Sequence, residues 1–258
     1  MDIGNNIKVS VVWMTRKRSH ELIYSLSSFV QNADNNKNIE YFFALDPDDK
    51  ETIDALNKVA PMCYAHDAIL SCFIMDKQYG YGELEQYQNK AGELFTGECL
   101  FIFNDDLICI EKGWDTNLRN AIAPVTGQPF WIAGIPLNEI WKGTPTFVGI
   151  NRKWYEIVRR VSGSRATDGY LKLVGLGAGI LPLNSNMKML HLQRGKGDME
   201  YVNNGVKKTI FGLPDDGAGG YSTKVKVPAK YWLDYGEGRE RIEEDIQKLL
   251  SWRSENGK

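Results

Sequence analysis

Two adjacent aspartates follow an apolar run near the middle of the chain. The run covers residues 99–103, and Asn104, Asp105 and Asp106 come directly after it. Adjacent carboxylates repel each other unless a cation neutralises them. The hard ions Mg²⁺ and Mn²⁺ bind such oxygen ligands, commonly together with substrate phosphates. The pattern therefore indicates a divalent-metal site, and a turn with a helix-capping aspartate is the alternative interpretation.

Two other apolar runs also end in polar residues that suit ligand binding. Asp46 follows residues 39–45, and Thr15 and Arg16 follow residues 7–14. A carboxylate in the position of Asp46 suits a hydrogen bond to a base or a ribose, and an ordinary turn is the alternative. We therefore expect Thr15, Arg16 and Asp46 to meet a ligand at one edge of a sheet.

His191 is one of three histidines in the chain and lies in a short apolar stretch, residues 189–192. A lone histidine in such a stretch is more often a core residue with an internal hydrogen bond than a ligand. It becomes a candidate metal ligand if a metal binds nearby.

The elements that must position these side chains alternate along the first 106 residues. The predicted strands are the apolar runs 7–14, 39–45, 68–75 and 99–103. The three intervening segments have apolar residues at helical spacing. Such alternation predicts a parallel sheet covered by helices. Ligands bind at the carboxyl ends of the strands in such sheets, where the polar residues above are found.

The second half of the chain is less regular. Its predicted helices are residues 114–122, 154–161 and 168–176, its predicted strands are 130–135, 146–150 and 187–192, and residues 193–230 are predicted to be a long loop. A final predicted helix, residues 238–252, carries Ile242, Ile246 and Leu249 on one stripe. That stripe indicates a helix that docks on the body of the protein.

Composition excludes several classes of protein. The 258 residues include 31 Lys and Arg against 33 Asp and Glu, and 43% are hydrophobic. This excludes a disordered tail, a fibrous repeat and a disulfide-stapled mini-domain. A net charge of −2 also argues against a protein that mainly coats nucleic acid.

Cysteine spacing and hydropathy bear on the compartment. The four cysteines have neither zinc-site nor disulfide-framework spacing, so we interpret them as small buried residues in a reducing compartment: Cys63, Cys72, Cys99 and Cys109. The polar N-terminus lacks a signal-peptide core, and no apolar run is long enough to span a bilayer. The expected location is the cytoplasm.

Together these features resemble the GT-A glycosyltransferases, especially the inverting enzymes of family 2. The stretches that carry the resemblance are residues 9–18 with Leu22 and Leu26, residues 44–46, 89–98 and 101–106, the pair Thr167-Asp168, and His191. The family's metal motif is usually Asp-x-Asp, and here Asn104 takes its first position. The resemblance covers residues 7 to 192, and the order of the motifs is more specific than any one of them.

The resemblance implies an α/β fold of the GT-A type, a Rossmann-like α/β/α sandwich with a mostly parallel central sheet and an irregular C-terminal extension. We expect one domain over residues 1–258. Within it, the resemblance implies that residues 7–106 would bind the nucleotide sugar and that residues 107–192 would form the acceptor half. Residues 193–258, which the resemblance does not cover, would form a C-terminal loop and docking helix.

The implied activity is transfer of a sugar from a nucleotide-diphosphate donor, with a UDP-sugar expected first, to an acceptor hydroxyl. The implied roles are metal ligands Asp106, Asp105 and His191 for Mn²⁺ or Mg²⁺, and donor contacts from Thr15, Arg16, Asp46, Asn89, Lys90, Asn104 and Asp105. The cation would neutralise the diphosphate leaving group.

Asp168 occupies the place of the family's catalytic base, although Thr167 stands where the family has a glutamate. As a general base it would accept the acceptor's proton opposite the leaving group, and the anomeric centre would invert. Glu139 is a reserve candidate whose simpler interpretation is an exposed loop acid. Trp141, beside it in a predicted loop, is a candidate for stacking on a sugar.

Two other functions stay open from the sequence. A nucleotidyltransferase also uses acidic strand ends and a metal, but the loop at residues 15–18 lacks the glycines of a phosphate loop. A non-catalytic nucleotide- or carbohydrate-binding module with a degenerate site is the second alternative. The acceptor class, whether a glycan, a lipid-linked glycan or a modified nucleic acid, is also open. A lysine-bearing segment after residue 206 suits an anionic acceptor, or is simply a solvated loop.

Overall fold

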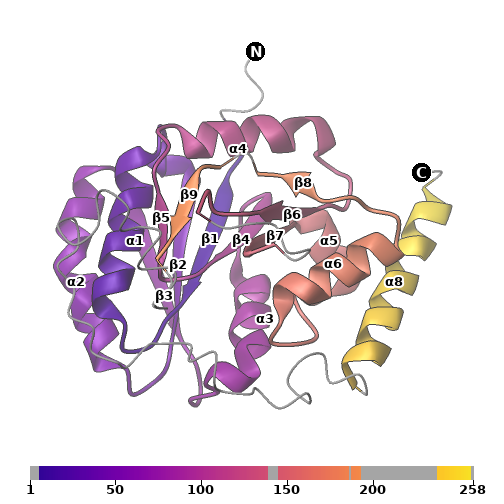
Figure 1. The fold of residues 1–258 in the computed structure, drawn as a ribbon, viewed down its shortest axis with the longest axis horizontal. Helices are drawn as coiled ribbons and strands as arrows, with labels where there is room; N and C mark the ends of the chain where they lie inside the picture. Colours follow the sequence, from indigo (N-terminus) through magenta and orange to yellow (C-terminus); the bar gives the residue numbers. More distant parts are fainter. Residues whose placement is uncertain (1–5, 139–144, 186, 193–236, 257–258) are drawn as a thin grey trace.

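A computed structural model describes residues 6–138, 145–185, 187–192 and 237–256 (Figure 1). Its centre is a seven-stranded sheet in the order β3-β2-β1-β4-β7-β6-β8, and a two-stranded sheet pairs β5 with β9. Glu139 and Trp141 lie outside the described residues, and so do the lysine-bearing segment and the loop predicted at 193–230.

Four neighbouring strands of the large sheet are parallel, as predicted. They are β3 (Ile69–Ile74), β2 (Ile39–Leu45), β1 (Val9–Met14) and β4 (Cys99–Phe103). β1 and β4 are buried on both faces, which explains their continuous apolar sequence. Their carboxyl ends lie side by side because Trp13 of β1 pairs with Phe43 of β2 and Phe103 of β4.

The sheet continues with strands from the second half of the chain. β7 (Phe147–Asn151) runs antiparallel to both β4 and β6 (Trp131–Gly134), and β8 (Leu183–Asn184) is parallel to β6. Gly149 is required in β7, since a Cβ there would lie 2.6 Å from the carbonyl oxygen of Leu100. The small sheet pairs β5 (Leu107–Cys109) with β9 (Met189–His191).

Helices cover both faces of the sheet (Figure 1). In the figure α1 (Ser19–Asn32) and α2 (Lys50–Ala65) lie on one side and α3 (Leu84–Leu94), α5 (Arg152–Val158) and α6 (Thr167–Gly177) on the other, with α4 (Trp114–Ile122) along one end of the strands. Short 3₁₀ turns cover Asn36–Asn38, Tyr81–Glu83 and Ala123–Val125. The final helix, α8 (Glu237–Glu255), packs against α5 and α6.

Alternation along β1 divides the core between the two faces. Val11 and Trp13 join the cluster that includes Phe29 of α1, whereas Val12 joins the cluster that includes Ala91 of α3. This period-2 pattern is the usual consequence of a pleated strand. The predicted α/β architecture with a mostly parallel sheet is therefore confirmed.

Two expectations need correction. The sequence pattern did not indicate β5 and β8, because strands of three and two residues are too short to produce a period. Cys72 is exposed rather than buried, since it lies on β3 at the edge of the sheet, whereas the other three cysteines are buried as predicted.

Among the described residues, none of the helices has the length and apolar character needed to cross a membrane.

Candidate functional site

The chain turns sharply where β4 ends. The backbone N–H of Leu107 donates to the carbonyl of Asn104 over 3.2 Å, which closes a turn around Asp105 and Asp106. Both aspartates are buried, with 4% and 5% of their surface exposed. Asn104 is half-buried beside them. A buried pair of carboxylates requires compensating charge and hydrogen bonds.

Arg18 supplies that charge, from the loop between β1 and α1. Its Nη1 lies 2.5 Å from Oδ1 of Asp105, and its Nη2 lies 2.9 Å from Oδ2 of Asp106. The hydroxyl of Thr15 donates to the other oxygen of Asp105 over 2.8 Å. Thr15 therefore meets the β4 carboxylates, and Arg18 was not among the predicted site residues.

His191 reaches the same carboxylates because β5 and β9 pair. Leu107 lies opposite His191 in that pairing, and Nε2 of His191 is 3.0 Å from Oδ1 of Asp106. Asn138 holds the histidine backbone from the other side, accepting from its N–H over 2.9 Å and donating to its carbonyl over 2.7 Å. The structure thus brings the three predicted metal ligands together.

Burial and charge shift the pKa values of the two aspartates in opposite directions. Burial raises the pKa of Asp105, an effect that Arg18 and Thr15 oppose and the charge of Asp106 reinforces. Burial also acts on Asp106, but the hydrogen bond from His191 and the charge of Arg18 outweigh it and lower the pKa of Asp106. The site therefore holds anionic charge on Asp106 most firmly.

A second group of charges forms at the end of β2. Asp46 is buried, and its two oxygens accept from the hydroxyl of Tyr87 and, over 2.9 Å, from Nη1 of Arg16. Arg16 also forms a two-pronged ion pair with the exposed Asp48, at 2.6 and 2.7 Å. Asp46 and Arg16 were predicted to lie together, whereas Tyr87 of α3 was not anticipated.

The backbone of Lys17 separates the two arginines. Its φ of +53° lies in the left-handed region, which is unusual for a residue with a Cβ. On either side of it, Arg16 pairs with the carboxylates after β2 and Arg18 with those after β4. Two arginines of one short loop therefore neutralise carboxylates at the ends of two different strands.

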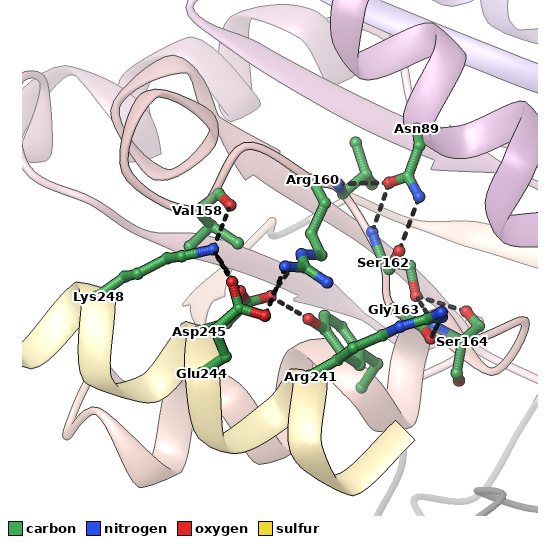
Figure 2. A network of polar contacts seen from close by, with 12 residues as sticks. Asn89, Val158, Arg160, Ser162, Gly163, Ser164, Arg241, Glu244, Asp245 and Lys248 are labelled. Carbon is green, nitrogen blue, oxygen red and sulfur yellow. Dashed lines mark hydrogen bonds and ion pairs between the residues drawn. The ribbon is translucent and has the colours of Figure 1, made fainter. Parts of the chain in front are cut away.

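Asn89 and Lys90 of α3, predicted as donor contacts, make other interactions. The Asn89 side chain accepts from the backbone N–H groups of Val161 and Ser162, at 2.7 and 3.0 Å, and donates to the Ser162 carbonyl over 2.8 Å (Figure 2). The ammonium group of Lys90 pairs with Glu93 on the exposed surface. Asn89 thus holds the loop that precedes α6.

Asp168 lies in the first turn of α6, directly after a contact with α3. The hydroxyl of Thr167 donates to Oε1 of the buried Gln88, and Tyr87, the residue before Gln88, bonds to Asp46. Burial raises the pKa of Asp168, opposed by the backbone N–H groups of Asp168 and Gly169. The candidate base is therefore linked to the β2 carboxylate through two adjacent residues of α3.

Helix α8 holds the same loop from the opposite side (Figure 2). Nη1 of Arg241 donates to the Gly163 carbonyl over 3.0 Å. The buried Asp245 accepts from the hydroxyl of Tyr170 in α6 and pairs with Arg160 and Lys248, each at 3.3 Å. The docking predicted from the apolar stripe of this helix is confirmed, and these polar contacts were not anticipated.

Three aromatic residues of the second half are part of the core. Trp131, Trp154 and Tyr170 are at most 1% exposed. The sequence left open whether these aromatic residues stack on a ligand or pack in the core, and their burial shows that they pack in the core.

Comparison with known proteins gives a likeness in structure. No family model matches the chain, and no curated protein matches it in sequence. It is similar to the mannosyltransferase PcManGT from Pyrobaculum calidifontis in complex with GDP-Man and Mn²⁺, with a TM-score of 0.57 and 13% identity over 76% of this chain and 60% of that one.

It is also similar to residues 1–349 of TarS from S. aureus in complex with UDP, with a TM-score of 0.52 and 14% identity over 71% of this chain and 57% of that one. A longer TarS chain gives a TM-score of 0.51 and 14% identity over 65% of this chain and 33% of that one. The match spans less than two thirds of each of these three chains. The protein therefore shares the fold of these structures, which is the expected GT-A fold.

Proposed function

We propose that the protein is a metal-dependent glycosyltransferase that moves a sugar from a nucleotide-diphosphate donor to an acceptor hydroxyl. One observation carries the proposal: buried carboxylates at the ends of β2 and β4, two arginines and a histidine converge at the carboxyl edge of the sheet. This edge binds ligands in sheets of this kind. The shared fold with PcManGT and TarS supports the same activity class.

The donor set at β4 fits a divalent cation in its chemistry. Mn²⁺ binds both carboxylates and imidazole, whereas Mg²⁺ binds carboxylates in preference to imidazole. No three Asp, Glu, His or Cys side chains in the described part of the chain are spaced to hold an ion by themselves. We infer that Asp106, Asp105 and His191 would hold the cation together with the donor phosphates. The bound cation would neutralise the charge that develops on the leaving diphosphate.

The β2 side of the site would hold the nucleoside. Asp46 and Arg16 are ion-paired there, and Asp46 is buried while Arg16 is 23% exposed. The partly exposed guanidinium suits a contact with a base or ribose, oriented by the carboxylate behind it. Thr15 and Asn104 flank the boundary with the β4 carboxylates, close to where the phosphates would lie. A uridine nucleotide is the first donor class to test.

Asp168 would act as the general base. Ionised Asp168 takes the proton of the acceptor hydroxyl while the oxygen of that hydroxyl attacks the anomeric carbon. The bond from the anomeric carbon to the diphosphate oxygen breaks at the same time. Attack opposite the leaving group inverts the anomeric centre. The raised pKa of Asp168 supports this role, because a stronger base accepts a proton more readily.

A donor panel tests the proposal. UDP-glucose, UDP-N-acetylglucosamine, GDP-mannose and a thymidine diphosphate sugar are incubated with the protein and Mn²⁺ or a chelator. We expect one nucleotide class to release free sugar and nucleoside diphosphate only with the metal present, and Asp106→Asn to abolish this release. Asp54→Asn is the matched control, because Asp54 forms an exposed ion pair on α2. Release of pyrophosphate, or indifference to every donor and to metal, would contradict the proposal.

A further inference from the structure

Arg18 bridges the two carboxylates that follow β4. One guanidinium contacts both aspartates, through Nη1 to Asp105 at 2.5 Å and through Nη2 to Asp106 at 2.9 Å. The two remaining carboxylate oxygens bond to Thr15 and His191. Each of the four oxygens that would face a metal therefore already has a partner.

A divalent cation and Arg18 cannot share these oxygens without strong repulsion. Both carry positive charge, and the carboxylates are almost fully buried, where charge interactions are weakly screened. The Arg18 side chain is 27% exposed, whereas the side chains of Asp105 and Asp106 are only 5% and 7% exposed. The carboxylates are fixed by the turn after β4 and by the pairing of β5 with β9.

We propose that Arg18 is an exchangeable counter-cation: it neutralises Asp105 and Asp106 before a metal binds and moves to the donor diphosphate when the metal takes its place. A guanidinium binds phosphate oxygens in the same two-pronged geometry that it uses here with carboxylates. Metal binding would thereby make the Arg18 guanidinium available to bind the donor phosphates. The metal and the nucleotide would therefore bind cooperatively. The exchange of Arg18 for a metal rests on the metal site of the proposed function, and the move of Arg18 to the diphosphate rests in addition on its nucleotide donor.

The test measures Mn²⁺ binding to the full chain by the electron paramagnetic resonance signal of free Mn²⁺, without any nucleotide. Weak binding is expected for the parent, because the described side chains are not spaced to hold an ion by themselves. Removing the competing guanidinium in Arg18→Gln is expected to tighten Mn²⁺ binding about tenfold, the effect of one charge-assisted hydrogen bond. Arg18→Lys keeps the charge and loses the two-pronged contact. Its affinity for Mn²⁺ should therefore lie between those of the parent and of Arg18→Gln.

Arg16→Gln is the matched control, because it removes the same charge from the same loop but from a different pair of carboxylates. We expect its Mn²⁺ affinity to stay within about twofold of the parent. The exchange is wrong if Arg18→Gln binds Mn²⁺ no more tightly than the parent, or if Arg16→Gln tightens binding equally. A thermal unfolding curve for each variant establishes that it folds.

A second arm repeats the titration with UDP and with GDP. In the parent, Mn²⁺ should strengthen binding of the accepted nucleotide, and Arg18→Gln should reduce this enhancement about tenfold. An unchanged enhancement would overturn the transfer of Arg18 to the diphosphate. Failure to bind either nucleotide would count against the proposed function and against that transfer, whereas the metal-only arm would still decide whether Arg18 and the cation compete.

Discussion

At the scale of single residues, the two arginines of the β1–α1 loop divide the strand-end carboxylates between them. Arg16 pairs with Asp46 and Asp48, and Arg18 pairs with Asp105 and Asp106. Burying an uncompensated carboxylate costs several kcal/mol, so the pairing explains how this edge of the sheet keeps so much negative charge out of water. Asp168 differs, since burial shifts its pKa without an opposing charge from a described neighbour.

Asp168 should set the acidic side of the pH–rate profile. A general base must be ionised, so turnover falls as pH falls through its pKa. Because burial raises that pKa above the ordinary value of 3.8, the loss of activity should begin at a higher pH than for an exposed aspartate. Asp168→Asn should lower kcat by a factor of about 10²–10⁴ and leave the donor KM nearly unchanged. Steady-state kinetics across pH measure both.

Stability provides a control for the same variant. The raised pKa means that the folded state binds the Asp168 proton more tightly than the unfolded state does. The contribution of Asp168 to the free energy of unfolding therefore falls as pH rises from the unfolded pKa through the folded pKa. Asp168→Asn should therefore unfold at no lower urea concentration than the parent at neutral pH. Full turnover by this variant would show that Asp168 is not the base.

At the scale of elements, α8 and α3 hold the loop before α6 between them (Figure 2). Asn89 bonds to the loop backbone from α3, and Arg241 bonds to Gly163 from α8. Asp245 anchors α8 to the loop after α5 through Arg160 and to α6 through Tyr170. The position of Asp168 thus depends on a helix that lies far along the chain.

Asp245→Ala should loosen α8 from the body. It leaves Arg160 without this carboxylate and leaves the hydroxyl of Tyr170 without its acceptor, so we expect a loss of about 2–3 kcal/mol in the free energy of unfolding. Urea unfolding measures the loss, and limited proteolysis should cut near α8 first. Glu243→Ala is the matched control in the same helix, since Glu243 forms an exposed pair with Arg239 and should cost less than about 0.5 kcal/mol. Equal losses in the two variants would contradict the anchoring role.

At the scale of the whole molecule, a buried ion pair within α4 connects this helix to the segment before β1 and to the segment after α1. Arg119 and Asp115 are 2.6 Å apart and at most 1% exposed. Arg119 also donates to the carbonyls of Ile7 and Asn35, and Asp115 accepts from the backbone N–H groups of Asp34 and Asn35. Three segments far apart in the sequence meet at this pair.

Arg119→Met should destabilise the entire fold. It leaves the buried Asp115 without its counter-charge, and breaking such a pair costs about 3–4 kcal/mol. The free energy of unfolding in urea is the measurement. A double variant, Asp115→Leu with Arg119→Met, should recover part of the loss, because no isolated charge is then buried. A loss below about 1 kcal/mol in the single variant would contradict the importance of the pair, and Lys50→Met, in an exposed pair, is the control.

The sequence predicted those features that depend on local pattern. Apolar runs and helical spacing identified β1 to β4 and the helices between them, because a strand buried on both faces or a helix with one apolar stripe leaves a regular trace in the sequence. The order of the elements then predicted that Asp46, Asp105 and Asp106 would lie at one edge, since parallel strands align their carboxyl ends. The metal, donor and base roles of these residues stay predictions.

Contacts between segments far apart in the chain were decided by the tertiary structure. The pairing of β5 with β9 brings His191 to Asp106. A strand at residues 187–192 was predicted, but the three residues of β5 leave no readable period, so its pairing with β9 was not predicted. The sequence around Asn89 does not distinguish an amide that contacts a nucleotide-sugar donor from one that bonds to the loop before α6. The packing of α3 against that loop decides that Asn89 bonds to the loop. The sequence by itself determined which residues end the strands. The tertiary structure decided which of them meet Arg16, Arg18 and His191, because side-chain partners depend on loop geometry and packing rather than on local pattern.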